Sequence, residues 1–481
     1  MYDVLVIGAG FAGLAAAKRL DQAGCANLAV LEARDRVGGR TRHGVVGGLD
    51  VDLGGMWLGP SQTRLAEWAQ HYQVRTYPTH LEGKAIYRLG GKEHHGDRED
   101  LEGAFGWLEG FDYLSASRQL EKLSAGIDCD APWDHPQAAK LDGQTVETWL
   151  TENVRSARLR ELFRVLCYAL FCAEASQISM LFFLHYVKSG DNLDVLVSAD
   201  KGGAQNFMFH GGVHQIARKM AEELGDRVHL NAPVTRIEQT SGHIIVSTAQ
   251  DEWKARSVIV SVPPTLVPKI DFTPALPRPK AALHAKLAMG SAIKYWIVYE
   301  TPFWRAQGFN GLIIRDDVAC TPCMDVSPPG QPKGVIAGFF DGDHALTHGD
   351  AGMEARRGQV VAMLAEHFGK AAETSLEYRD VDWTAEDWSA GCYGAYAAPG
   401  VYARYGAWLR RPVGSIYWAG TETSPRWTGY IDGAIRSGER AAEEVLAAHR
   451  DGAIGLDSPD AIDGAKAGDV RPAVEHAAMT S

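Results

Sequence analysis

The 481-residue sequence predicts an α/β protein in which a parallel sheet, assembled from separate parts of the chain, is joined to a second domain of mixed α+β structure. Three observations support this class. Residues 3–31 follow a strand, glycine-rich turn, helix and strand pattern, residues 75–210 show mostly helical apolar spacing, and several short strands follow Gly211-Gly212. Because a chain of this length exceeds a single hydrophobic core, we expect about two or three domains.

The N-terminal element has the form of a dinucleotide-binding unit. A strand over 3–7 runs directly into a turn that carries Gly8, Gly10, Ala12 and Gly13, an apolar helix follows, and a second strand over 28–31 ends at Glu32. Glycines let the backbone approach a pyrophosphate, the helix N-terminus favours its negative charge, and an acid at the end of the second strand can bind the ribose. The complete context makes this motif much more specific than isolated glycines.

The middle of the chain predicts a helical region followed by strands. Apolar residues recur at helical spacing over 145–151 and 157–172, and residues 178–188 are almost continuously apolar and aromatic. A short helix over 213–224 then leads to strands at 228–230, 234–237, 244–248 and 257–262, the last of which is stopped by Pro263-Pro264. Strands so close together can return to the N-terminal sheet, which would make that domain discontinuous.

The region between residues 388 and 438 combines a thiol, two spaced aromatic residues and a strand-to-helix turn, which is typical of a site rather than of a core. Its features are Cys392 beside Tyr393, a strand-like run from Ser415 to Ala419, the turn Gly420-Thr421-Glu422, and Trp427-Thr428-Gly429-Tyr430 before a helix. This region resembles the flavin-binding C-terminal region of the monoamine oxidase family, and residues 392–439 align with that pattern without a gap.

The resemblance implies that the Cys392 thiol carries covalently attached FAD and that Tyr393 and Tyr430 face each other across the substrate path. Lys294 lies in an apolar strand at 293–299 and matches the lysine that family members hydrogen-bond, through water, to the reactive flavin nitrogen. Burial would lower the pKa of such a lysine, whereas an edge lysine with its ammonium in water is the alternative. Lys294, Tyr393 and Tyr430 are the predicted catalytic residues.

The resemblance also favours FAD over NAD, because residues 33–40 continue the fingerprint with glycines and arginines that NAD enzymes do not usually place there; a solvated basic turn is the alternative. Val234 matches a backbone contact to the adenine, although a plain strand valine would look the same. The predicted FAD-binding set is Gly8, Gly10, Ala12, Gly13, Glu32, Ala33, Arg34, Gly39, Arg40, Gly55, Met56, Trp57, Val234, Trp383, Cys392, Gly420, Glu422, Tyr430 and Ile431.

Trp57 bears on the substrate. L-amino acid oxidases, which share the architecture, place an arginine at this position and pair it with the substrate carboxylate. An anion without such a partner in a closed pocket is costly, so the tryptophan argues for an amine that lacks a carboxylate. Carried over from the family, the predicted substrate-binding residues are Tyr168, Phe171, Val197 and Gln205, although the two aromatic residues could equally belong to the core.

We therefore expect FAD-dependent oxidative deamination of aromatic or aliphatic primary monoamines, with O2 as oxidant and aldehyde, ammonia and hydrogen peroxide as products. Two alternatives remain open. A diamine or polyamine oxidase, such as a putrescine oxidase, would need a carboxylate for the second ammonium, and Glu174 is a candidate by position. A flavin-binding module that has lost catalysis would keep the cofactor site alone.

Composition excludes several other classes. A net charge of −12 and a pI near 5.8 disfavour nucleic acid and anionic membranes as partners. No signal peptide or apolar run of membrane-spanning length is visible, so we expect a soluble, cytoplasmic protein; a homodimer is compatible with these features. The seven cysteines predict reduced thiols, and the lone pair Cys320 and Cys323 predicts no metal site.

The expected architecture is that of the amine oxidases, with a Rossmann-like FAD-binding domain and a mixed α+β substrate domain whose sheet is largely antiparallel. The FAD-binding domain is predicted to be discontinuous, over residues 1–75, 211–285 and 386–450. The substrate domain is predicted to take residues 76–210 and 286–385. Residues 451–481 are rich in Ala, Asp, Gly and Pro and predict a flexible tail.

Overall fold

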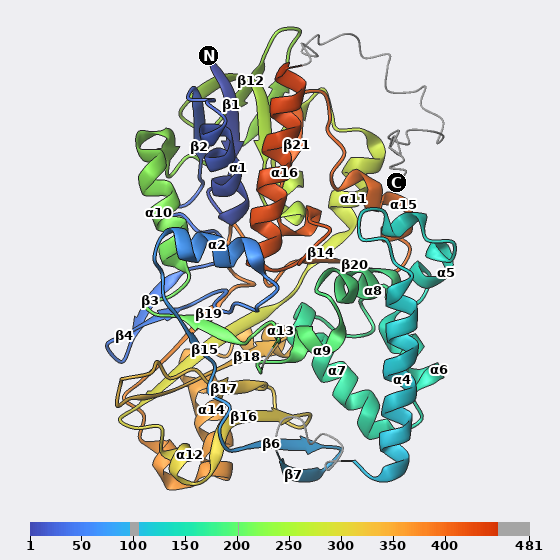
Figure 1. Ribbon diagram of the computed structural model, residues 1–481, viewed down its shortest axis with the longest axis vertical. Coiled ribbons are helices and arrows are strands. Elements are labelled where there is room, and N and C mark those ends of the chain that lie inside the picture. The colour runs from blue at the N-terminus through green and yellow to red at the C-terminus, as the bar shows by residue number, and fades with distance from the viewer. Residues whose placement is uncertain (97–104, 201, 451–481) are drawn as a thin grey trace, which may run out of the picture.

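Two large sheets lie at opposite ends of the molecule (Figure 1). The computed structural model describes residues 1–96, 105–200 and 202–450, so the predicted tail at 451–481 lies outside the described residues. Helices α1 (Phe11–Gln22) and α16 (Ile431–Arg450) lie beside the sheet at the upper end of the view, and α4 (Trp107–Ala125) and α7 (Ala157–Phe171) lie on the side of the lower half.

The first sheet is the predicted discontinuous one. In spatial order its strands are β13 (Asp271–Thr273), β10 (Arg236–Gln239), β11 (Ile244–Ser247), β12 (Glu252–Val260), β1 (Tyr2–Ile7), β2 (Leu28–Leu31) and β9 (Val228–His229), and β21 (Ile416–Trp418) pairs with β12. Strand β1 pairs in parallel with β2 on one side and with β12 on the other, so that Val4 lies opposite both Leu28 and Ser257. The predicted α/β class is confirmed.

Small residues let α1 lie close to its neighbours. Ala15, Ala16 and Ala17 have no exposed surface. A Cβ added to Gly438 of α16 would lie 2.0 Å from the Ala12 carbonyl oxygen of α1, which shows how closely the two helices approach. Helix α10 (His214–Leu224) packs its apolar face against the same core. The start of α1 is therefore fixed from several sides at the edge of the sheet.

The second sheet is largely antiparallel, as predicted. Its order is β19 (Glu377–Asp382), β15 (Ala292–Tyr299), β18 (Gly334–Asp341), β17 (Cys323–Asp325), β16 (Phe309–Arg315), β6 (Lys84–Leu89) and β7 (Lys92–Gly96), and only the β16–β6 pair among these is parallel. Every residue of β15 is buried. Its residues Ile293, Tyr295 and Ile297 pack with α14 (Met353–Phe368). Since side chains alternate across a strand, Lys294 and Trp296 point to the opposite face.

A helical layer covers one side of the lower half. Besides α4 and α7 it contains α5 (Ala138–Asp142), α6 (Val146–Asn153), α8 (Met180–Ser189) and α9 (Leu193–Val197). The prediction that residues 75–210 are mostly helical is only partly correct, because β5 (Thr76–Pro78), β6, β7 and β8 (Phe207–Phe209) also lie there. Gly90 and Gly91, both with positive φ, make the tight β6–β7 turn.

Two predicted strands are displaced along the chain. The strand expected over 234–237 runs from Arg236 to Gln239, and the one expected over 257–262 runs from Glu252 to Val260. In the first case Val234 stays in the loop before β10, since strand pairing with β11 begins at Arg236 opposite Ser247. The loop position leaves Val234 at the edge of the sheet, where it can face a ligand.

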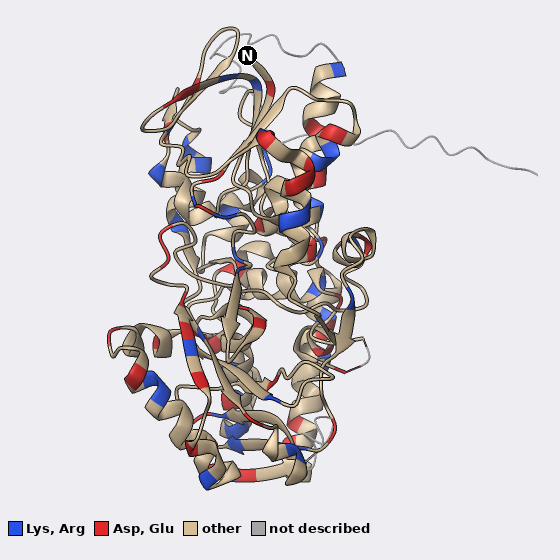
Figure 2. Cartoon of the chain, turned by 90° about the vertical axis from the view of Figure 1, so that its left-hand side faces the viewer, with Lys and Arg blue, Asp and Glu red and all other residues tan. Residues whose placement is uncertain are grey.

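Three short sheets and several further helices complete the described part of the chain. They are β3 (His43–Val46) with β4 (Leu49–Asp52), β5 with β8, and β14 (Leu287–Met289) with β20 (Ala395–Ala397), together with α2 (Thr63–His71), α11 (Arg278–Lys286), α12 (Phe303–Ala306), α13 (Asp343–Gly349) and α15 (Tyr402–Tyr405). Acidic and basic residues are interspersed on the side shown in Figure 2. Among the described helices, none is both long and apolar enough to span a membrane.

Candidate active site

A cavity of about 370 Å³ runs from the glycine-rich turn after β1 to the tyrosines of the C-terminal region. Most of the predicted residues line it: Gly8, Gly10, Ala12, Glu32, Ala33, Arg34, Gly39, Arg40, Gly55, Met56, Trp57, Gln205, Val234, Lys294, Trp383, Cys392, Tyr393, Gly420, Tyr430 and Ile431. They come from both large sheets and from the segments between them. The structure therefore brings together residues that are spread over most of the sequence.

At one end of the cavity the backbone forms an open cradle. Gly8 has φ +102°, and a Cβ on Gly13 would lie 1.9 Å from the Gly8 carbonyl oxygen, so Gly13 serves the packing of α1 on β1 rather than the lining. Helix α1 starts after Gly10 without a side-chain cap. The N–H groups of its first turn are thus free to bind an anion, which fits the pyrophosphate of a dinucleotide.

Glu32 organises the same end of the cavity. Its side chain is buried; Oε2 accepts a hydrogen bond from Ala9 N at 2.7 Å, and Oε1 accepts one from Arg34 N at 3.0 Å. These bonds tie the end of β2 to the turn after β1. A carboxylate oxygen at the cavity wall has further acceptor capacity, so Glu32 could also receive a ribose hydroxyl.

The arginines after Glu32 do not form a solvated turn. Arg34 is bonded to Glu386 and donates to Ser389 Oγ at 2.8 Å. Arg36 donates to the Gly39 and Thr41 carbonyls at 3.1 and 3.0 Å, and burial lowers its pKa to about 10. The alternative of a water-exposed basic turn is therefore wrong, because these side chains fix the loop from within.

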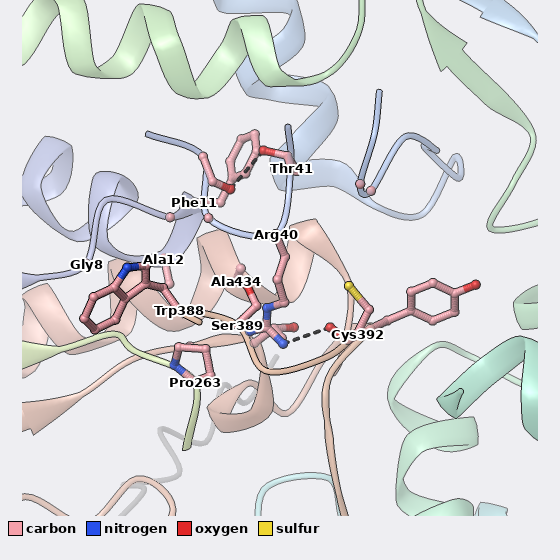
Figure 3. Close-up of a pocket in the computed structure, with 18 of the residues that line it drawn as sticks. Gly8, Phe11, Ala12, Arg40, Thr41, Pro263, Trp388, Ser389, Cys392 and Ala434 are labelled. Atoms are coloured by element: carbon pink, nitrogen blue, oxygen red, sulfur yellow. Dashed lines mark hydrogen bonds between the residues drawn. The ribbon is translucent and has the colours of Figure 1, made fainter. Parts of the chain in front are cut away.

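Arg40 joins the two ends of the cavity (Figure 3). It donates to Glu422 Oε1 at 2.7 Å, to Glu422 Oε2 at 3.3 Å and to the Tyr393 carbonyl oxygen at 2.8 Å. Burial alone would raise the pKa of Glu422, but the Arg40 guanidinium and the backbone hydrogen bonds to Glu422 together lower it. Glu422 itself lies behind Arg40, outside the lining, and acts on the cavity through this pair.

Lys294 is buried, with 3 % of its surface exposed, so the alternative of an edge lysine that reaches water is wrong. Its Nζ donates to the Gly54 carbonyl at 2.7 Å, to the Asp52 carbonyl at 3.3 Å and to Met56 Sδ at 2.9 Å. The ring of Trp57 lies 5.2 Å away. Burial lowers the pKa of Lys294 to about 7, so its charge changes within the physiological range.

Cys392 presents its sulfur to the cavity (Figure 3). Its backbone N donates to the Gly290 carbonyl at 2.9 Å, and burial raises the pKa of its thiol to about 12.

Trp383 donates from Nε1 to the Leu53 carbonyl at 2.9 Å, and its ring would lie 2.9 Å from a Cβ on Gly54. Trp383 therefore fixes the chain segment that places Gly55 and Met56 at the cavity wall.

The two tyrosines are held by different neighbours. The ring of Tyr393 meets that of Phe339 edge-on, with centroids 5.8 Å apart. Tyr430 packs between Trp427 at 4.9 Å and Tyr186 at 6.0 Å. Burial raises the pKa of both hydroxyl groups, so both rings are neutral. An apolar, aromatic compartment results, well suited to desolvate a small amine.

The helix α7 presents a different face from the one predicted. Ala169 and Leu170 line the cavity. Tyr168 instead donates from its hydroxyl to Glu174 at 2.6 Å, and Phe171 packs behind Tyr186 with ring centroids 4.5 Å apart. Successive positions on a helix are about 100° apart. An error of one residue in the predicted helix phase therefore assigns core residues to the cavity wall.

Val197 and Gln205 are the other two predicted substrate-binding residues. Val197, half-buried at the end of α9, packs against the helical core, whereas Gln205 lines the cavity, its Nε2 donating to the Leu196 carbonyl at 2.9 Å. Tyr186 and Phe339 also line it and were missed. Tyr186 belongs to an almost continuously apolar helix, and Phe339 to a buried strand, so neither carried a signal that separates lining from core.

Comparison with known proteins agrees with this site. The family model for flavin containing amine oxidoreductase matches residues 11–446. The chain belongs to the flavin-containing amine oxidase family. Amine oxidase (flavin-containing) B of Cavia porcellus is 37% identical over 451 residues, which cover 92% of this chain and 86% of that protein.

Two solved structures are similar throughout. Cyclohexylamine oxidase from Brevibacterium oxydans IH-35A has a TM-score of 0.89 and 32% identity, covering 93% of this chain and 99% of its own. Wild-type putrescine oxidase bound to putrescine has a TM-score of 0.88 and 31% identity, with 93% and 99% covered. A redesign of cofactor binding in putrescine oxidase, with an alanine replaced by cysteine, matches at 0.88 and 31%, with 92% and 98% covered.

The protein is thus a flavin-containing amine oxidase that uses FAD. The residues present fit the cofactor: an uncapped helix start and a glycine cradle for the pyrophosphate, Glu32 beside them, and a run of apolar wall beyond Arg40 for the flavin ring. The pairing of amine site and nucleotide site in one cavity is what oxidation of an amine by bound FAD requires.

Proposed function

We propose that this amine oxidase acts on primary monoamines with an aromatic or medium aliphatic tail, and converts them with O2 to aldehyde, ammonia and hydrogen peroxide. One observation carries the preference for a single amine. Among the described residues that line the cavity, Glu32 is the only acidic one, and it is bonded at the cradle. A diamine would bring a second ammonium that no lining carboxylate is available to meet, which is costly in an apolar pocket.

Glu174, the alternative candidate for that role, is engaged elsewhere. Its Oε2 accepts the Tyr168 hydroxyl at 2.6 Å and its Oε1 accepts Asp343 N at 3.3 Å. It does not belong to the cavity lining. The likeness to a putrescine oxidase bound to putrescine nevertheless makes diamine oxidation the second candidate, and the substrate test below decides between them.

The chain's own groups prepare the amine for oxidation. When bound, FAD supplies the group that accepts the equivalent of a hydride from the carbon next to nitrogen and passes the electrons to O2. Tyr393 and Tyr430 confine and desolvate the amine between neutral rings. Gln205 Oε1 is buried without a hydrogen-bond partner among the described residues, and can accept an N–H of the substrate.

Among the residues that the structure describes, no free cation near the tyrosines is available to a substrate carboxylate. Trp57 occupies the wall there, and Lys294 beside it already donates to three acceptors. Arg40 is paired with Glu422. Amino acids should therefore be much poorer substrates than the corresponding amines, by orders of magnitude when a charge enters unpaired.

The test is a comparison of phenylethylamine, phenylalanine and putrescine under anaerobic conditions, with bleaching of the flavin absorbance as the signal. Rapid bleaching by phenylethylamine alone supports the proposal. Faster bleaching by putrescine would identify a diamine oxidase. Equal rates with phenylalanine and phenylethylamine would contradict the role of Trp57. Bleaching by any amine excludes a module that has lost catalysis.

We also propose that FAD is attached covalently through the Cys392 sulfur to the methyl group of its benzenoid ring. The thiol lines the cavity next to Tyr393, and in putrescine oxidase a cysteine was introduced in a redesign of cofactor binding. After acid precipitation the wild-type pellet should stay yellow, whereas Cys392→Ala should release its FAD to the supernatant. A colourless wild-type pellet refutes the linkage without touching the assignment to the family.

The division into domains stays a proposal as well. All strands of the first sheet fall within residues 1–75, 211–285 and 386–450, which supports their assignment to the FAD-binding domain, and residues 76–210 and 286–385 would form the substrate domain. Limited proteolysis with and without FAD tests it, since FAD should protect the first set. A cytoplasmic location and a homodimer also stay predictions, and light scattering measures the latter.

A further inference from the structure

One aromatic residue of the cavity lining stays partly in water. Trp388 lines the cavity and is 37 % exposed, whereas the other aromatic side chains described in the lining are buried or half-buried. In Figure 3 Trp388 lies on the side of Ala12, in the first turn of α1. Cys392 lies on the other side of Arg40. Because a large apolar ring is stabilised when a ligand covers it, Trp388 has a face available to a molecule bound at the nucleotide end.

The turn that carries Trp388 is closed by backbone hydrogen bonds. Ser389 N and Ala390 N both donate to the Glu386 carbonyl, at 3.1 and 2.7 Å. Ala390 has φ +52°, a left-handed conformation that a residue other than glycine keeps only where its surroundings impose it. The indole is therefore presented from a fixed turn rather than from an open loop.

Arg34 ties this turn to the nucleotide end of the cavity. Its Nε donates to Glu386 Oε1 at 3.0 Å, and its Nη2 donates to Glu386 Oε2 and, at 2.8 Å, to Ser389 Oγ. A two-point contact between a guanidinium and a carboxylate fixes direction as well as distance. Arg34 itself follows Glu32, whose carboxylate binds the turn after β1. The position of Trp388 is thus set from the same loop that forms the nucleotide site.

We propose that Trp388 is a cofactor-binding residue, whose indole covers the nucleotide half of FAD and slows its release, and that the Glu386–Arg34 pair positions this indole. The same short segment then covers the nucleotide at Trp388 and presents the thiol of Cys392 to the cavity. The role rests on the use of FAD in this family. It depends neither on the preference for a monoamine nor on the covalent linkage.

The first test measures FAD binding in the Cys392→Ala background, in which the proposed linkage cannot form. Trp388→Ala should raise both the Kd for FAD and the rate of FAD release about tenfold or more, the effect of losing one aromatic contact to a nucleotide. Trp388→Phe keeps a ring and should keep most of the affinity. Flavin fluorescence gives the Kd on titration of the apoenzyme and the release rate on dilution of the holoenzyme.

Trp107→Ala is the matched control, because Trp107 is 73 % exposed in α4 and lies outside the cavity lining. It should leave the Kd and the release rate unchanged. A Trp388→Ala variant that holds FAD as tightly as Trp107→Ala does would overturn the proposal.

Glu386→Gln tests the positioning contact without altering the cavity lining, to which Glu386 does not belong. It should speed FAD release, because the turn loses its charged bond to Arg34. Combined with Trp388→Ala, it should release FAD no faster than Trp388→Ala alone, since both changes remove the same contact. Additive effects would show that Glu386 acts on FAD independently of Trp388, and its positioning role would be wrong.

Oxidative footprinting gives a readout that needs neither turnover nor a substitution at Trp388. In Cys392→Ala, hydroxyl radicals should oxidise Trp388 several times faster in the apoenzyme than in the FAD-loaded form, while Trp107 should react equally in both. Equal oxidation of Trp388 with and without FAD refutes the covering role. If the wild type itself binds FAD without a covalent bond, the same series is run with Cys392 in place, so this proposal and the linkage fail separately.

Discussion

The two ends of the cavity are built in different ways. At the nucleotide end, the backbone of residues 8–12 forms much of the wall, and charged side chains are bonded to it or to each other, such as Glu32 to Ala9 N and Arg40 to Glu422. At the amine end, rings from several elements form the wall, and the ionisable groups are buried as neutral acids or as a lysine with a lowered pKa. Binding of the nucleotide needs fixed charges and dipoles, whereas catalysis needs groups whose protonation state can change.

The largest expected effect comes from the nucleotide end. Gly13→Ala would place a Cβ 1.9 Å from the Gly8 carbonyl oxygen, so the turn after β1 would have to open and FAD binding should be lost. Overpacking of this kind costs about 1–3 kcal/mol of unfolding free energy. Flavin absorbance of the purified variant and thermal unfolding measure both effects.

Gly358→Ala is the control for that change. Gly358 is exposed in α14 and a Cβ there meets nothing within 4 Å, so the variant should bind FAD normally and gain about 0.5–1 kcal/mol from helix propensity. If Gly13→Ala binds FAD as well as Gly358→Ala does, the backbone cradle is not what holds the nucleotide.

The next effect separates the two halves of the reaction at Lys294. We expect Lys294→Met to slow reoxidation of reduced flavin by O2 about a hundredfold, because a buried cation stabilises the negative charge that develops on oxygen, and to slow reduction by amine less. Stopped-flow mixing follows the two steps separately. A larger loss in reduction would show that Lys294 acts on the amine or on the geometry of Gly54 and Met56, to which it donates.

The pH dependence of reoxidation sharpens this assignment. The pKa of Lys294 is lowered to about 7 by burial, so the cation is present below pH 7 and lost above it. Reoxidation of the wild type should therefore fall as the pH rises through about 7, with the steepest part at the pKa. Lys294→Met should show no such fall, and a wild-type rate that rises over the same interval would contradict the assignment.

The smallest expected effect concerns the phase of α7. Tyr168→Phe removes a hydroxyl that is bonded to Glu174 outside the cavity, so kcat/KM for phenylethylamine should change less than about twofold while stability falls by about 1 kcal/mol. Ala169→Leu, one residue along, should narrow the cavity and raise KM. Steady-state kinetics of the pair decides which face of the helix meets the substrate.

The difference between the two ends also explains what could be predicted from the sequence. The nucleotide site is local in the sequence, because its strand, glycine-rich turn, helix and Glu32 all lie within one short stretch. Lys294 was recognisable because a lysine interrupts an apolar strand and has no other reason to be there. In both cases a residue type conflicts with its neighbours unless it has a function.

The amine end offers no such conflict. Tyr186, Phe339 and Leu170 are apolar or aromatic residues among others of the same kind, and only packing of α7, α8 and β18 around the cavity distinguishes lining from core. Long-range packing of this kind leaves no periodic trace in one sequence.

The first sheet combines strands from both ends of the described chain, which has a consequence for the protein during its synthesis on the ribosome. The cavity is lined by Ile7 near the start of the described chain and by Ala434 near its end, and β21 completes the sheet beside β12. Domains fold as units while the chain leaves the ribosome, yet this cofactor site cannot close until almost the whole described chain has emerged. FAD therefore enters a nearly finished protein, and truncated translation products should remain colourless.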